Sequence, residues 1–231
     1  MDVLLVRAAD VPEYVQDGVV DCGITGQDLV AERGARVDEL LELGFGSCRL
    51  EVAVPEESSY EQIADLAGAS VASVYPVLTR QLMPVEVELV DVTGSVEIAP
   101  RLGLAQAIVD LVSSGNTLRT NGLRSLGSLF SSQAVLIGSP GSDTARLVAM
   151  MRAVVEARAH RYLMFNVPEA KLADVCLIIG SDSPSVLPLA ATGMVAVHAL
   201  VPSAEVWRLL PELAEAGASS ILVVPVERMA R

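Results

Sequence analysis

Short aliphatic runs alternate with helix-like segments along most of this chain. Residues 48–54 (CRLEVAV) and 132–137 (SQAVLI) are two such runs, and prolines or small polar residues follow them. Residues 27–33 have helical character and stop at Gly34. Strands that alternate with helices in this way predict an α/β protein built from parallel sheets. Residues 1–6 predict one more buried strand at the start.

Length and composition restrict the class of protein further. The 231 residues, 52% of them apolar, can form two or three small domains. Every apolar run is shorter than the roughly 18 residues of a membrane span, and the start of the chain has no export signal. Cys22, Cys48 and Cys176 lack the spacing of a zinc site and are typical of free thiols in a reducing compartment. We therefore expect a cytoplasmic protein without a membrane partner.

The net charge of −13 argues against nucleic acid as a partner. The same charge would also repel a polyphosphate ligand. Binding of such a ligand would have to rest on local donors, on helix N-termini and on a divalent metal.

Residues 97–118 combine two carboxylates with a polar loop. Glu97 follows a strand-like segment, and the apolar residues up to Val109 recur at helical spacing, which predicts a helix before Asp110. The loop that follows is rich in hydroxyls and backbone donors: Ser113, Ser114, Gly115, Asn116 and Thr117. Backbone amides beside a carboxylate suit a phosphate and the hydroxyls of a sugar. Local composition alone favours the plainer alternative of a strand, a helix and a polar turn.

The complete string resembles the signature of the ATP phosphoribosyltransferase family, which opens histidine biosynthesis. That signature is a Glu, a Gly, a small residue, an aliphatic residue, an Asp and then a Ser/Thr-Gly-x-Thr-Leu/Met loop. The positions that match are Glu97, Gly103, Ala105, Ile108, Asp110, Ser114, Gly115, Thr117 and Leu118.

The last seventy residues predict a separate unit with the order strand, helix, strand, strand, helix, strand. This βαββαβ order resembles a ferredoxin-like, ACT-like regulatory domain. The segments YLMFNVP, SDSPSVLPLA, VAVHALVP and ILVVPVERM resemble the histidine-binding domain of the long form of the same family. Before it, residues 142–160 predict one long helix, whose methionines we interpret as core residues.

The resemblance implies a two-lobed, periplasmic-binding-protein-like catalytic core with the substrates in the cleft. Lobe I would be residues 1–55 and 127–155, lobe II residues 56–126, and the regulatory domain residues 156–231. The implied reaction condenses ATP with phosphoribosyl pyrophosphate, with the assistance of Mg²⁺, and histidine inhibits it. The family's long form also implies a homo-oligomer, from dimer to hexamer.

The resemblance also implies roles for single residues. Asp110 would accept the ribose hydroxyls, Glu97 would support the loop at the cleft, and residues 113–118, ending at Leu118, would hold the 5′-phosphate. The nucleotide would lie beside Asp21, Thr25, Gly26 and Tyr75. Tyr75 either stacks on a ring or is a half-buried aromatic with its hydroxyl at the surface. No residue is assigned to the metal.

The histidine effector would contact a set of residues in the C-terminal unit: Asn166, Ser183, Pro184, Ser185, Ala199 and Leu200. Asn166 stands where family members often carry Asp, so its bond to the effector's ammonium would be neutral and weaker. The family's first strand and a Lys-Gly-Arg-like loop are expected before Met1. Without them, the alternative is a catalytically impaired homologue that binds nucleotide or histidine as a regulatory protein.

Overall fold

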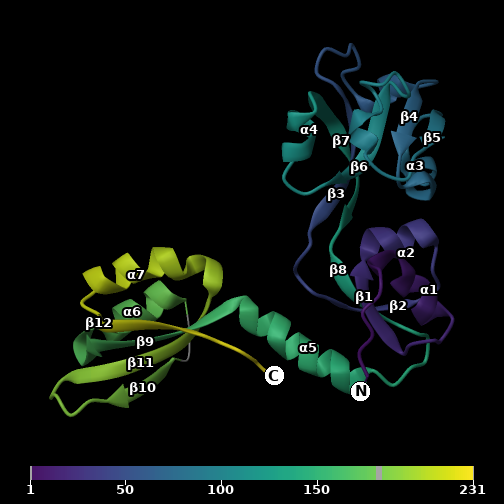
Figure 1. Ribbon diagram of the computed structural model, residues 1–231. Helices are drawn as coiled ribbons and strands as arrows, with labels where there is room; N and C mark the ends of the chain where they lie inside the picture. The colour runs from purple at the N-terminus through teal and green to yellow at the C-terminus, as the bar shows by residue number, and fades with distance from the viewer. Residues whose placement is uncertain (1, 181–183, 231) are drawn as a thin grey trace. The chain divides into compact units, whose positions relative to one another are not determined.

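The computed structural model describes residues 2–180 and 184–230, and its contacts divide the chain into two compact units (Figure 1). The first unit is Met1–Thr144 and the second is Ala145–Arg231. The first unit has two sheets and the second has one, and each unit has its own apolar core.

A three-stranded antiparallel sheet forms one part of the first unit. Its order is β1 (Cys22–Gly26), β8 (Ala134–Gly138) and β2 (Asp38–Glu42). Helix α1 (Val11–Gln16), which follows η1 (Ala8–Asp10), packs Val11 and Val15 against Val135 and Ile137 of β8. Helix α2 (Gln27–Arg33) continues directly from β1.

A five-stranded mixed sheet forms the other part of the first unit, in the order β5-β4-β6-β3-β7. The strands are β3 (Cys48–Pro55), β4 (Ser70–Ser73), β5 (Glu88–Asp91), β6 (Ala107–Val112) and β7 (Leu123–Ser132). Strand β4 runs parallel to β5 and β6, whereas β3 is antiparallel to β6 and β7. The shorter elements are η2 (Ile63–Leu66), α3 (Pro76–Leu82), η3 (Val96–Ile98) and α4 (Asn116–Thr120).

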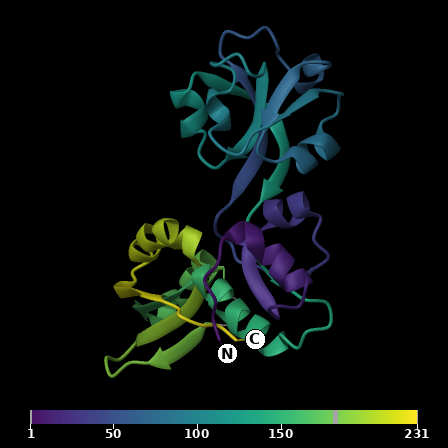
Figure 2. The same cartoon turned by 45° about the vertical axis from the view of Figure 1, so that its right-hand side comes forward.

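The two faces of this sheet carry separate apolar cores. Leu50, Val52 and Val109 face the cluster that includes Leu78 of α3, and Ile108 and Val112 face the cluster that includes Leu118 of α4. Figures 1 and 2 show α3 and α4 beside the sheet. Because strand β6 is covered on both faces, it is apolar at nearly every position.

Several expectations for the first unit are wrong. The sheets are not parallel throughout: the three-stranded sheet pairs only antiparallel strands among the described residues. Residues 1–6 form no described strand, and Leu5 is 97% exposed because no strand pairs with this segment. The lobe boundary expected at residue 55 falls one strand too late, since β3 hydrogen-bonds to β6 and β7 in the five-stranded sheet.

The second unit begins with α5 (Ala145–Arg158) and continues as a four-stranded antiparallel sheet in the order β10-β11-β9-β12. The elements are β9 (His160–Pro168), η4 (Glu169–Lys171), α6 (Leu172–Ile179), β10 (Ser185–Pro188), β11 (Met194–Pro202), η5 (Ser203–Glu205), α7 (Val206–Glu215) and β12 (Ser219–Pro225). This is the expected βαββαβ order, and the ferredoxin-like arrangement is confirmed.

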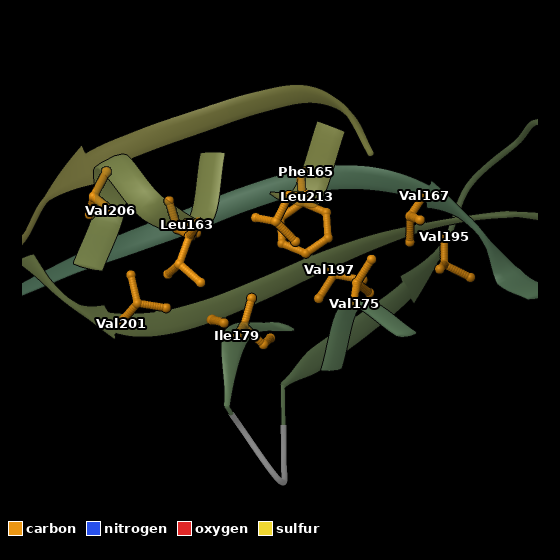
Figure 3. Close-up of a cluster of buried hydrophobic side chains, with 12 residues drawn as sticks. Leu163, Phe165, Val167, Val175, Ile179, Val195, Val197, Val201, Val206 and Leu213 are labelled. Atoms are coloured by element: carbon orange, nitrogen blue, oxygen red, sulfur yellow. The ribbon is translucent and has the colours of Figure 1, made fainter. Parts of the chain in front are cut away.

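Alternation along β9 and β11 builds the core of this unit. Leu163, Phe165 and Val167 of β9 point to one face together with alternate residues of β11. Figure 3 shows these side chains beside those of α6 and α7. In contrast, α5 contributes little core: Met150 is 60% exposed, so the interpretation of its methionines as core residues is wrong there.

Candidate functional site

The polar loop after Asp110 connects β6 to α4 and is open to solvent. Ser113 and Ser114 are exposed, and Gly115 has a φ of +74°, a left-handed conformation that favours glycine at the start of α4. The amide of Asn116 donates to the Ser114 Oγ at 3.5 Å. The other amides of a first helical turn have no partner within the helix. The buried side chain of Leu118 fixes α4 to the sheet, so the loop presents donors on a rigid support.

Asp110 lies on a strand, and the helix predicted before it is wrong. The segment folds as η3, a series of turns, and then β6. Two of the apolar positions that gave the helical spacing, Ile108 and Val109, belong to β6. This strand is buried on both faces, so it lacks the apolar-polar alternation that distinguishes a strand from a helix. The consequence for the site is that the Asp110 carboxylate stands on the sheet, three residues before Ser113.

The carboxylates of Asp110 and Glu97 interact. Burial raises the pKa of Asp110, a hydrogen bond from the Leu111 amide to its Oδ1 (2.8 Å) opposes this rise, and the negative charge of Glu97 adds to it. Glu97 lies half-buried in η3. The structure therefore brings the two acidic residues of the signature together, close to the point where β6 ends and the loop begins.

A charged pair on β3, which no sequence motif marks, belongs to the same region. The Arg49 Nε donates to the Glu51 Oε1 at 2.7 Å, and Glu51 is the register partner of Asp110 on β6. The available signal was the pair of charges in CRLEVAV, because charged residues are rare in a central strand. Without the strand register, however, nothing in the sequence links β3 to Asp110.

A cavity of about 520 Å³ opens where β3 begins and where β6 and β7 end. Its lining residues are mostly polar: Gln27, Glu42, Ser47, Cys48, Arg49, Val112, Ser113, Ser131, Ser132 and Gln133. Arg49 is the only basic side chain among the described residues that line it. Because Ser113 belongs both to the cavity and to the polar loop, the two form one continuous polar region.

The nucleotide-side residues predicted from the sequence do not line this cavity. Asp21 is exposed in the turn before β1. Thr25 is buried, and its hydroxyl already donates to the Ala8 carbonyl at 2.8 Å. Gly26 leaves room for a neighbouring side chain, since a Cβ there would lie 2.2 Å from the Asp28 Oδ1. Thr25 and Gly26 thus have local structural roles in the strand-to-helix turn.

Tyr75 takes part in a buried hydrogen-bond network. Its hydroxyl donates to the Asp28 Oδ2 at 2.9 Å, and Ser132 donates to the other carboxylate oxygen of Asp28. Burial and the Asp28 charge together raise the pKa of Tyr75 far above its ordinary value. Tyr75 is half-buried, as one alternative expected, and its hydroxyl is paired with a buried carboxylate. Asp28 and Ser132 were not identified from the sequence, because their contact spans more than a hundred residues.

In the second unit, the predicted effector residues divide between the two faces of the sheet. Asn166 and Ser185 share the face without helices, because their register partners Ala196 and His198 are alternate residues of β11. Leu200 lies on the same face. Ala199, however, is buried in the core on the helical side.

The two remaining predicted effector residues precede β10 in the sequence, and Pro184 is adjacent to it. Pro184 is half-buried there, and Ser183 lies outside the described residues.

Within residues 2–180 and 184–230, no group of three or more His, Cys, Asp or Glu side chains could hold a metal ion. Mg²⁺ is commonly held by one or two carboxylates together with substrate phosphates. The Asp110 and Glu97 carboxylates are of the right chemical type. In the described part of the chain, no helix is long and apolar enough to cross a membrane.

Comparisons with known proteins place this geometry in a family. A family model described as ATP phosphoribosyltransferase matches residues 7–157, and a model described as the HisG C-terminal domain matches residues 157–228. The ATP phosphoribosyltransferase of Methanosarcina barkeri is 40% identical over 241 residues, which cover 98% of this chain and 83% of that protein.

Two solved structures are similar to the chain. The ATP phosphoribosyl transferase (HisG:HisZ) complex from Thermotoga maritima matches with a TM-score of 0.59 and 25% identity, over 66% of this chain and 78% of that one. The structure of Tv2483 bound to L-arginine matches with a TM-score of 0.50 and 19% identity, over 66% of this chain and 65% of that one. The latter likeness concerns the fold alone.

Proposed function

Because this chain belongs to the ATP phosphoribosyltransferase family, we propose that it condenses ATP with phosphoribosyl pyrophosphate, the first step of histidine biosynthesis. The family match over both units carries this proposal. The loop after Asp110, with its exposed donors next to two carboxylates, supports it. We place the reaction in the cytoplasm, where the three free cysteines would stay reduced.

In the proposed reaction, N1 of the adenine attacks C1 of the ribose. The bond from C1 to the pyrophosphate oxygen breaks as the C1–N1 bond forms, and pyrophosphate leaves with the electron pair. The exocyclic amino group of the adenine then loses a proton to solvent. Catalysis of such a step requires positioning and charge stabilisation, and no covalent intermediate with the protein.

The residues of the site have distinct proposed roles. The amides and hydroxyls of residues 113–118 hold the 5′-phosphate, and the ionised Asp110 accepts hydrogen bonds from the ribose hydroxyls. Glu97 keeps a second negative charge near the ribose, which favours positive charge at C1 in the transition state. Asp110 and Glu97 are also the groups that would hold Mg²⁺, which when bound would neutralise charge on the leaving pyrophosphate.

We keep Tyr75 with Asp21, Thr25 and Gly26 as proposed residues of the nucleotide side. In the second unit, we propose histidine as an effector on the sheet face that Asn166 and Ser185 share. A homo-oligomer, as a dimer or a hexamer, is the proposed assembly.

A continuous assay of pyrophosphate release, with ATP, phosphoribosyl pyrophosphate and Mg²⁺, tests the function. Asp110→Ala should lose most turnover while it keeps the circular dichroism spectrum of the wild type. Addition of histidine should lower the rate of the wild type, and Asn166→Ala should weaken that inhibition. Release of pyrophosphate at the wild-type rate by Asp110→Ala would refute the assignment of the site.

A further inference from the structure

Arg49 and Glu51 form a charged pair that the proposed reaction has not yet used. Both residues belong to β3, a central strand that pairs with β6 on one side and β7 on the other. The Arg49 Nε and the Glu51 Oε1 are 2.7 Å apart. The Glu51 side chain is only 7% exposed, whereas that of Arg49 is 56% exposed. Glu51 is therefore the buried anchor, and the guanidinium reaches toward solvent.

The strand register explains why Glu51 needs this partner. Glu51 and Asp110 are directly opposite each other on antiparallel strands, so their side chains share one face of the sheet. Opposed Cβ atoms in such pairs lie about 4.5–5.5 Å apart, and like charges at these positions are destabilising. The Arg49 guanidinium offsets the Glu51 charge. In turn, the Glu51 carboxylate limits the directions in which the Arg49 side chain can point.

The free end of Arg49 is available to a ligand. Arg49 lines the cavity of about 520 Å³ together with Ser113, the first residue of the loop after β6. Its Nη1 and Nη2 atoms make no hydrogen bond within the described parts of the chain. A guanidinium with two unpaired terminal nitrogens matches two oxygens of a phosphate group. In a protein of net charge −13, a polyphosphate would depend on such a local cation.

We propose that Arg49 binds the pyrophosphate group of phosphoribosyl pyrophosphate in this cavity, and that Glu51 is the positioning residue that aligns it. The inference rests on the proposed function, because it assigns a binding site to the leaving group of that reaction. Arg49 is the register partner of Val112, so the pyrophosphate at Arg49 and the 5′-phosphate at residues 113–118 would both lie next to the ribose at Asp110. As the bond at C1 breaks, the guanidinium would stabilise the charge that gathers on the pyrophosphate.

Calorimetric titration of the full chain with magnesium pyrophosphate tests the inference without turnover. Loss of one charge-assisted contact should weaken binding by about 10- to 100-fold in Arg49→Ala. Glu51→Gln should weaken binding several-fold, since it keeps an acceptor for Nε but loses the charge that holds it. Arg80→Ala is the matched control: Arg80 is exposed on α3 and does not line the cavity. Its affinity should equal that of the wild type.

Two further measurements separate binding from a merely structural effect. Arg49→Gln/Glu51→Gln removes both charges with little change in volume, so the buried carboxylate is never left unpaired. This variant should fold and still bind pyrophosphate weakly. Added guanidinium ion at low millimolar concentration should restore part of the affinity of Arg49→Ala and have no such effect on the wild type.

The outcomes distinguish this inference from the proposed function. If the wild type binds pyrophosphate through Arg49 but releases none from the two substrates, the proposed function fails and the binding site stands. If the wild type is active and the folded double variant binds pyrophosphate as tightly as the wild type, the inference is overturned and the function stands.

Discussion

Removal of the Tyr75 hydroxyl should destabilise the first unit measurably. The hydroxyl donates at 2.9 Å to the carboxylate of Asp28, which is only 5% exposed. Tyr75→Phe keeps the ring, which packs against the core cluster that includes Leu50 and Leu66, and deletes only this bond. A hydrogen bond to a charged group contributes about 1.5–3 kcal/mol, and a buried carboxylate oxygen that loses a donor is costly.

The expected loss is therefore about 1.5–3 kcal/mol in the free energy of unfolding. For a unit of this size, 1 kcal/mol corresponds to about 2–4 °C in Tm, so the transition of the first unit should fall by roughly 3–12 °C. Differential scanning calorimetry of the full chain can resolve this transition. The two units need not unfold in one transition. The transition that Tyr75→Phe shifts belongs to the first unit, and the Tm of the second unit should stay unchanged.

Tyr14→Phe is the matched control, because the Tyr14 side chain is partly exposed and its hydroxyl makes no hydrogen bond in the described residues. Its effect should stay within about 0.5 kcal/mol. Equal Tm values for Tyr75→Phe and Tyr14→Phe would refute the reasoning, since the network would then contribute nothing. A coupling of about 0.5–3 kcal/mol between Tyr75→Phe and Ser132→Ala would locate the effect in the shared carboxylate.

Three other outcomes follow from the site. Burial raises the folded-state pKa of Asp110 above its unfolded value, so its ionisation costs stability as pH rises through the folded pKa. Asp110→Asn should therefore unfold at higher urea concentration than the wild type at pH 7, although it should lose activity. Below the ordinary carboxyl pKa, the variant and the wild type should be equally stable. For the same reason, the acidic limb of the kcat/KM profile of the wild type should lie above the range of an unperturbed aspartate, as pyrophosphate release from pH 3.5 to 8 would measure. Gly26→Ala should destabilise the first unit by about 1–3 kcal/mol in urea titrations, because the added Cβ would meet the Asp28 carboxylate at 2.2 Å.

The second unit could be predicted almost entirely from the sequence. Leu163, Phe165 and Val167 alternate with polar or half-buried neighbours, and the same alternation recurs in β11. In an antiparallel sheet with one covered face, this alternation marks the buried side directly. The register then follows from the requirement that both strands turn their apolar residues to the helices.

The first unit was harder to predict because its central strand is buried on both faces. Residues 107–112 carry no alternation, so their apolar run agreed with a helix as well as with a strand. Parallel strands were expected in general, and β4 does run parallel to β5 and β6, but β6 was predicted as a helix. The antiparallel insertion of β3 was not expected. Local sequence does not determine the order of strands in a sheet, because that order depends on contacts between residues far apart in the chain.

The order of residues alone determined the family signature, the polar loop and the position of Asp110 before it, because these features are contiguous in the chain. Only the tertiary structure placed Glu51 opposite Asp110, directed Arg49 into the cavity, and joined Tyr75, Asp28 and Ser132 in one network. The hydrogen bonds of this network connect residues that are 47 and 104 positions apart, and the placement of Glu51 depends on strand register. Burial then raised the pKa of the Asp110 carboxyl and of the Tyr75 phenol, and burial is a property of the folded chain.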